Sequence, residues 1–244
     1  MTRVGKQRVA VPFTIPGERV RIQMRRPVKG RPTERARAAS SREPNGVEFA
    51  TLVSVLRASP HRVAAPCPHF GPCGGCTWQH IAYPEQLRLK TALVDRLVRA
   101  AVPNAPAVRD TIASTPLAEP WGYRHKVHFV FAGSPVTMGH YARGSRHVVA
   151  VRECPVHDPR GNDVAFEFRK AFVRARLDTD RAGLRSLAVR VGAGTDEVMV
   201  TLVVSKEADR RTREATRTAM SRQSPSTSLH VNLHSRPEIG RAHV

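Results

Sequence analysis

Cys67-Pro-His-Phe-Gly-Pro-Cys73-Gly-Gly-Cys76 holds three of the four cysteines of this 244-residue chain, and Cys154, followed by Pro155, is the fourth. The pattern is C-x5-C-x2-C with one distant Cys-Pro. Gly74 and Gly75 allow the backbone to fold back on itself between two of the thiols. Thiols gathered in this way predict a metal centre formed by Cys67, Cys73, Cys76 and Cys154.

Three kinds of site compete for these cysteines. Four cysteines could form two disulfides, but disulfides belong to secreted proteins, and the N-terminus has no apolar signal segment. A structural zinc site usually shows two close ligand pairs, whereas a triplet followed by a distant Cys-Pro is more typical of an iron–sulfur cluster. We therefore favour a cluster over zinc. His69 and His80 are possible ligands, but four cysteines already complete the coordination, and a surface or supporting role is the simpler interpretation.

The cysteine stretch resembles the cluster segment of the RNA uracil-5-methyltransferases that carry a TRAM domain and a [4Fe–4S] cluster, a branch that includes the 23S ribosomal RNA enzymes. The resemblance covers nearly the whole chain. Its further parts are Val11-Pro12-Phe13, Ile15 to Val20, Gln79-His80, Tyr83, Gln86, Lys90, Tyr123-Arg124-His125-Lys126 and Glu153-Cys154-Pro155. It implies a class I, S-adenosylmethionine-dependent enzyme that methylates C5 of a uridine, in ribosomal rather than transfer RNA. It also implies a [4Fe–4S] cluster on the four cysteines.

The chemistry of uracil C5 methylation leads to a further expectation. The reaction needs a nucleophile that adds at C6 and a base that removes the C5 proton. The family uses a cysteine and a glutamate, both in a C-terminal Rossmann-like domain that binds S-adenosylmethionine. Here the cluster takes every cysteine, and no Gly-rich turn opens a helix after a strand. We therefore expect an N-terminal fragment without catalytic or S-adenosylmethionine-binding residues, inactive alone, with the cofactor bound by a missing domain.

Two other functions remain open. One is a stand-alone, metal-stabilised RNA-binding protein without catalysis. The other is a ferredoxin-like redox carrier, which the strongly basic charge disfavours.

The composition points to a polyanionic partner. Lys and Arg number 40 against 20 acidic residues, a net charge of +20, and only six of the basic residues are lysines. An excess of this size predicts RNA binding. No apolar run approaches the length of a membrane span. We expect a cytoplasmic monomer that binds RNA and no membrane.

The fold class predicted is α+β, with four segments along the chain. Residues 1–60 form an OB-like β-barrel, which the resemblance identifies as a TRAM domain whose first strand is missing, so that Met1 is an internal start. Residues 61–84 form the cluster loop, closed by Cys154. Residues 85–238 form a central α+β domain with helices on one face of a mostly antiparallel sheet. Residues 239–244 follow no pattern, and we expect a non-native tail beyond which the natural frame continues.

Alternating side chains predict strands, and apolar residues recurring every third or fourth position predict helices. Strands are expected at 7–12, 18–23, 47–56, 125–131, 136–141, 147–151, 187–191, 198–204 and 229–233, and helices at 84–101, 162–177 and 207–220. Basic and aromatic side chains on the strands and loops are candidate RNA contacts through phosphate pairing and base stacking. They are Arg19, Arg21, Arg25, Arg26, Lys29, Tyr123, Arg124 and Lys126.

Overall fold

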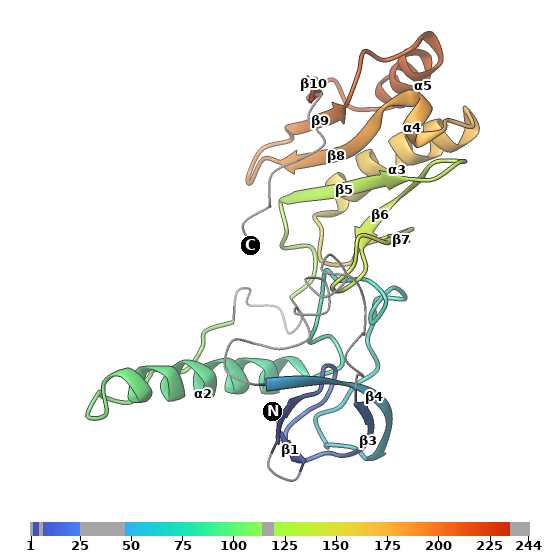
Figure 1. The fold of residues 1–244 in the computed structure, drawn as a ribbon. Helices are drawn as coiled ribbons and strands as arrows, with labels where there is room; N and C mark the ends of the chain where they lie inside the picture. The colour runs from blue at the N-terminus through green and yellow to red at the C-terminus, as the bar shows by residue number, and fades with distance from the viewer. Residues whose placement is uncertain (1, 5–6, 25–46, 114–119, 235–244) are drawn as a thin grey trace. The chain divides into compact units, whose positions relative to one another are not determined.

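A computed structural model describes residues 2–4, 7–24, 47–113 and 120–234 (Figure 1). The chain divides into two compact units. The first comprises Met1–Gly71 and Cys76–Ser114, and the second comprises Pro72–Gly75 and Thr115–Val244. The predicted tail at 239–244 lies outside the described residues.

The first unit contains a four-stranded sheet in the order β1-β2-β4-β3. Its strands are β1 (Thr2–Val4), β2 (Gln7–Ala10), β3 (Arg19–Met24) and β4 (Val47–Arg57). β2 and β4 pair in parallel, and the other neighbours are antiparallel. The polar–apolar alternation predicted β2, β3 and β4, and β1 is a further short strand before them. The assignment of residues 1–60 to a TRAM domain stays a prediction.

A long helix, α2 (Tyr83–Ala101), follows the cysteine loop. Pro84 lies in its first turn, where the missing N–H costs no helical hydrogen bond. The apolar stripe that predicted α2 is only partly covered in the first unit, because Leu93, Val94 and Leu97 are 40–59% exposed. Within the described ranges, no helix has the length and apolar character needed to cross a membrane.

The second unit is built on a six-stranded sheet in the order β10-β9-β8-β5-β6-β7 (Figure 1). Its strands are β5 (Lys126–Ala132), β6 (Thr137–Tyr141), β7 (Val148–Ala150), β8 (Leu184–Val191), β9 (Val198–Val204) and β10 (Thr227–Leu233). Its helices are α3 (Pro159–Arg174), α4 (Thr179–Ala182) and α5 (Arg210–Met220). Asp158 and Asp209 cap α3 and α5 by accepting hydrogen bonds from first-turn N–H groups.

The pairing of the last two strands corrects the predicted fold class. β9 and β10 are parallel, from Thr227 opposite Val198 to Leu233 opposite Val204, and α5 lies between them in the sequence. Parallel neighbours need a crossover connection, usually a helix, so β9–α5–β10 is a βαβ unit. The fold is therefore mixed α/β. The prediction of an α+β arrangement from which any Rossmann-like part is absent was wrong, because βαβ units are what such domains are built from.

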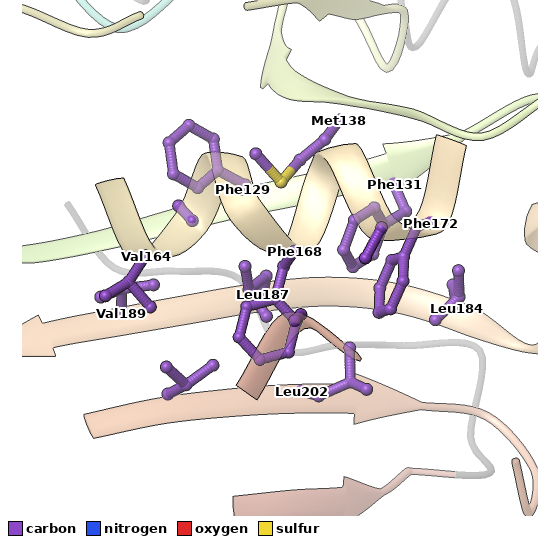
Figure 2. Packing of buried hydrophobic residues seen from close by; sticks show 14 of the residues in the cluster. Phe129, Phe131, Met138, Val164, Phe168, Phe172, Leu184, Leu187, Val189 and Leu202 are labelled. Carbon is purple, nitrogen blue, oxygen red and sulfur yellow. The ribbon is translucent and has the colours of Figure 1, made fainter. Parts of the chain in front are cut away.

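One apolar core holds the second unit together (Figure 2). Phe129 and Phe131 of β5, Leu187 of β8 and Leu202 of β9 meet Phe168 and other residues of α3. Alternate residues of β5 and β9 are buried, which is the expected pattern when helices cover one face of a sheet. The elements that flank Cys154, β7 and α3, belong to this unit.

Candidate metal centre and nucleic-acid interface

The four cysteines divide between the two units. Cys67 and Cys76 belong to the first, and Cys73 and Cys154 belong to the second. All four lie within the described residues, are half-buried, and form no disulfide. The disulfide alternative is therefore not what the structure adopts.

Cys67 is held by hydrogen bonds of its own backbone. Its N–H donates to Oε1 of the buried Gln79 at 3.2 Å, and its carbonyl accepts from Phe70 N–H at 3.1 Å. The second contact closes a turn directly after the cysteine. Gln79, which the family resemblance had singled out without a role, therefore positions the first thiol of the motif.

Three aromatic rings cluster beside the loop that carries Cys67. The rings of Phe13, Phe70 and His80 have centroids 5.2–6.2 Å apart. His80 is only 5% exposed, so it is not a surface histidine, and burial lowers the pKa of its imidazole. Phe70 therefore packs against Phe13 and His80 within this unit.

A buried ion pair fastens the same loops together. Arg62 donates to both carboxylate oxygens of Glu18 and also to the carbonyl of Phe13. Burial raises the pKa of the Glu18 carboxyl, but hydrogen bonds from Arg62 and from the N–H groups of Ile15 and Ser59 outweigh it and bring the pKa down to about 2. Glu18 is thus fully ionised at neutral pH, and its side chain is 1% exposed.

In the second unit, the Cys73-Gly74 segment lies against the turn between β6 and β7. Gly74 N–H donates to the carbonyl of Tyr141 at 2.9 Å, and Cys73 forms a bridge with Ala142. A Cβ on Gly74 would lie 2.6 Å from the Tyr141 carbonyl oxygen. Glycine is therefore required at this position for a steric reason, and the contact fixes the backbone beside Cys73.

Cys154 is held in a turn that leads from β7 to α3. Its carbonyl accepts hydrogen bonds from His157 N–H at 3.1 Å and from the Asn162 side-chain amide at 2.9 Å. The Oδ1 atom of Asn162 lies 3.2 Å from Nδ1 of His157. His157 is 1% exposed, and burial, followed by the effect of His140, lowers the pKa of its imidazole to about 4. The ring is therefore neutral at pH 7.

His140 of β6 completes a cluster of potential ligands around this cysteine. One ligand atom each from His140, Cys154 and His157 can be chosen so that all three lie within 4.8 Å of one another. The ring of His140 stacks on Phe129, with centroids 4.9 Å apart, and meets His157 edge-on. Sequence analysis missed both histidines as partners of Cys154. The short spacing from Cys154 to His157 was the one signal in the sequence, and it pointed to His157 alone.

The predicted RNA contacts Tyr123, Arg124 and Lys126 lie close to the turn that holds Cys154. Arg124 pairs in parallel with His157, and its N–H donates to the carbonyl of Val156 at 2.8 Å. Tyr123 is 44% exposed, and Lys126 is exposed at the start of β5. An exposed aromatic ring, two cationic side chains and the fourth cysteine are thus brought into one region of the second unit.

The structure describes only some of the predicted RNA contacts between residues 19 and 29. Arg19 and Arg21 lie on β3 with exposed side chains. Arg25, Arg26 and Lys29 lie outside the described residues. Exposure of Arg19 and Arg21 is compatible with phosphate contact and with a solvated surface, so their RNA role stays a prediction.

Comparisons with known proteins identify relatives of this chain. An uncharacterized RNA methyltransferase of Nostoc sp. is 33% identical over 210 residues, which are 83% of this chain and 42% of the relative. Similarly named proteins of Thermosynechococcus vestitus and Halalkalibacterium halodurans are 31% and 32% identical, and cover 81% and 73% of this chain. The aligned parts are 41% and 40% of those relatives. This chain is a homologue of proteins named as RNA methyltransferases, and it spans about two fifths of their length.

Two further comparisons complete this result. A solved structure of Pyrococcus abyssi tRNA (uracil-54, C5)-methyltransferase in complex with S-adenosyl-L-homocysteine aligns with 85% of this chain and 44% of its own, at 20% identity and a TM-score of 0.49. No protein-family model matches the chain.

These matches correct the prediction of a catalytically inactive fragment that lacks an S-adenosylmethionine-binding part. Relatives named as RNA methyltransferases align with most of the chain. The prediction rested on two absences in the sequence, a spare cysteine and a Gly-rich turn. A missing motif does not establish that an activity is missing, since motifs are hypotheses about structure.

Proposed function

We propose that this protein takes part in the S-adenosylmethionine-dependent methylation of C5 of a uridine in RNA, with ribosomal RNA as the substrate rather than transfer RNA. The observation that carries the proposal is the similarity, over most of the chain, to proteins named as RNA methyltransferases. The choice of uridine C5 and of ribosomal RNA rests on the family resemblance of the cysteine stretch and the segments around it. S-adenosylmethionine, when bound, supplies the methyl group.

The surface of the second unit supports the RNA part of this proposal. Tyr123 presents an exposed ring on which a base can stack, and Arg124 and Lys126 are neighbouring cations for phosphates. The net charge of +20 supplies the long-range attraction to a polyanion. We propose these residues, with Arg19, Arg21, Arg25, Arg26 and Lys29, as the RNA-binding set.

The proposal includes a [4Fe–4S] cluster on Cys67, Cys73, Cys76 and Cys154. Three features support the fit: the thiols are not in disulfides, they are half-buried, and four thiolates are the donor set that such a cluster takes. Within each unit, hydrogen bonds fix the backbone beside these cysteines, at Cys67 in the first and at Cys73 and Cys154 in the second. The role of the cluster would be to order the loops that carry the RNA contacts.

The experiment that tests the function is genetic. The gene is deleted in the source organism, and 5-methyluridine is measured in purified ribosomal and transfer RNA by nucleoside mass spectrometry. We expect one 5-methyluridine to disappear from ribosomal RNA and to return when the intact gene is restored. Loss from transfer RNA alone would move the substrate to that class, and unchanged 5-methyluridine in both RNAs would overturn the proposal.

A further inference from the structure

The two faces of the six-stranded sheet in the second unit differ in chemistry. On one face, α3, α4 and α5 contribute side chains to the apolar core. The other face, the open face, is formed by the side chains that alternate with the buried residues of β5, β8, β9 and β10. Its exposed members include Lys126, His128, Arg190, Met199 and His230. One solvated face is common in sheets with antiparallel strands, so the residues on it decide whether it has a function.

Two cations lie opposite one another at one end of the open face. Lys126 of β5 pairs directly with Arg190 of β8. Neither side chain forms an ion pair with a carboxylate of the described residues. None of the strands β5, β8, β9 and β10 contains an acidic residue. Like charges directly opposite on a sheet are destabilising, and a bound anion would convert this repulsion into attraction.

The neighbouring row of the open face carries two imidazole rings. His128 of β5 lies opposite Ala188, and His230 of β10 lies opposite Thr201. Ala188 and Thr201 pair with each other between them. Nε2 of His128 lies 2.8 Å from the hydroxyl oxygen of Ser186, which fixes this ring on the face. Exposed planar rings on either side of small residues offer surfaces on which unpaired bases can stack.

We infer that the open face binds a single-stranded segment of RNA. Lys126 and Arg190 hold a phosphate between them, and His128 and His230 contact bases. Charge complementarity selects this occupant, because a cationic face without acids attracts a polyanion, whereas a second copy of a chain with a net charge of +20 is repelled. Stacking on the rings favours a single strand, since the bases of a duplex are stacked within it. This inference rests on the proposed function, from which it takes RNA as the polyanion.

Charge reversal at position 190 separates RNA binding from folding. In Arg190→Glu a carboxylate would lie opposite Lys126, and opposite charges at such a position stabilise neighbouring strands. The variant should therefore unfold at a temperature no lower than that of the wild type, although its affinity for RNA falls. A residue that served only to hold the sheet together would lower both quantities.

The experiment measures the binding of the full chain to a short, fluorescently labelled, unstructured RNA by anisotropy over a range of salt concentrations. Arg190→Ala should weaken binding and reduce the slope of log affinity against log salt by about 1, and the double variant with Lys126→Ala should reduce it by about 2. His230→Ala should weaken binding with little change in the slope, because stacking releases no counterions. Arg174→Ala, at an exposed arginine of α3, is the matched control and should change neither quantity.

Each alternative has its own outcome. Wild-type binding together with unchanged slopes in Arg190→Ala and Arg190→Glu would overturn the inference and leave the proposed function intact. A duplex of the same sequence that binds as tightly as the single strand would overturn the choice of single-stranded RNA. A wild-type chain that self-associates, and whose Arg190→Glu variant does not, would assign the face to a second copy. Wild-type protein that binds no RNA would contradict both the inference and the RNA part of the proposed function.

Discussion

The two units of this protein are stabilised in different ways. The second has a large apolar core, in which the sheet and its helices bury Phe129, Phe168, Phe172 and many aliphatic residues. In the described part of the first unit, the buried aliphatic side chains are few and small: Val9, Ile15, Val47, Ala50 and Ile81. A buried ion pair between Glu18 and Arg62 joins its loops instead. The first unit therefore depends on polar contacts near the cysteines, and the second depends on hydrophobic burial.

The largest effect is expected from Phe168→Ala in the second unit. Phe168 is fully buried between α3 and the sheet, so truncation should cost about 3–5 kcal/mol of unfolding free energy. Hydrogen exchange resolved by peptide should show faster exchange in β5, β8 and β9. Val231→Ala, at an exposed position of β10, is the control with little expected effect. Equal loss of protection at residues 47–71 and 76–113 would contradict the separate stabilisation of the two units.

Glu18→Gln should destabilise the first unit, by somewhat less than Phe168→Ala destabilises the second. Removing one partner of a buried ion pair leaves Arg62 poorly compensated, and we expect a loss of about 3 kcal/mol, seen as faster exchange in β3 and β4. Asp110→Asn, an exposed acid of the same unit, should change nothing.

The same carboxylate gives a pH dependence. The pKa of Glu18 falls from 4.5 to about 2 on folding, so its contribution is complete above pH 4.5 and is lost as the pH falls towards 2. The wild-type first unit should therefore lose stability across this range, and Glu18→Gln should lose less. Parallel acid-unfolding curves for the two proteins would show that the ion pair is not what stabilises these loops.

Gly74→Ala should have an intermediate effect on the backbone beside Cys73. The added methyl would lie 2.6 Å from the Tyr141 carbonyl oxygen, and such overpacking costs about 1–3 kcal/mol. Gly75→Ala is the matched control, because its Cβ would lie 3.5 Å from the Cys73 sulfur, an ordinary contact. Exchange at the amide of residue 74, measured by NMR, should increase in the first variant and not in the second. Unchanged exchange of this amide in Gly74→Ala would contradict the close packing of this segment.

The smallest effect is expected from Lys126→Ala on RNA binding. Loss of one phosphate contact should weaken binding to all RNA sequences alike and reduce the slope of log affinity against log salt by about 1. Lys170→Ala on α3, where the lysine pairs with Glu167, is the control. An unchanged salt slope in Lys126→Ala would remove this residue from the RNA-binding set.

The sequence predicted the bounds of helices and strands better than it predicted which strands pair and which side chains meet. Alternation predicted β9 at 198–204 with the bounds that the structure has, and the leucine pattern predicted α2 to within a residue. The parallel pairing of β10 was not predictable in this way, since strand periodicity is the same for parallel and antiparallel neighbours. The metal-ligating potential of His140 was missed for a similar reason. Fourteen positions separate it from Cys154, and only the pairing of β6 with β7 brings the two side chains together.

The claim at the centre of this account is that the four cysteines hold an iron–sulfur cluster in an RNA-methyltransferase homologue, and metal analysis tests it most directly. Iron and acid-labile sulfide are measured in the wild-type chain purified without oxygen, and Mössbauer spectra are recorded. We expect about four irons and four sulfides per chain, as one cubane cluster requires, and their loss in Cys154→Ser. Wild-type protein that contains stoichiometric zinc and no iron would contradict the claim.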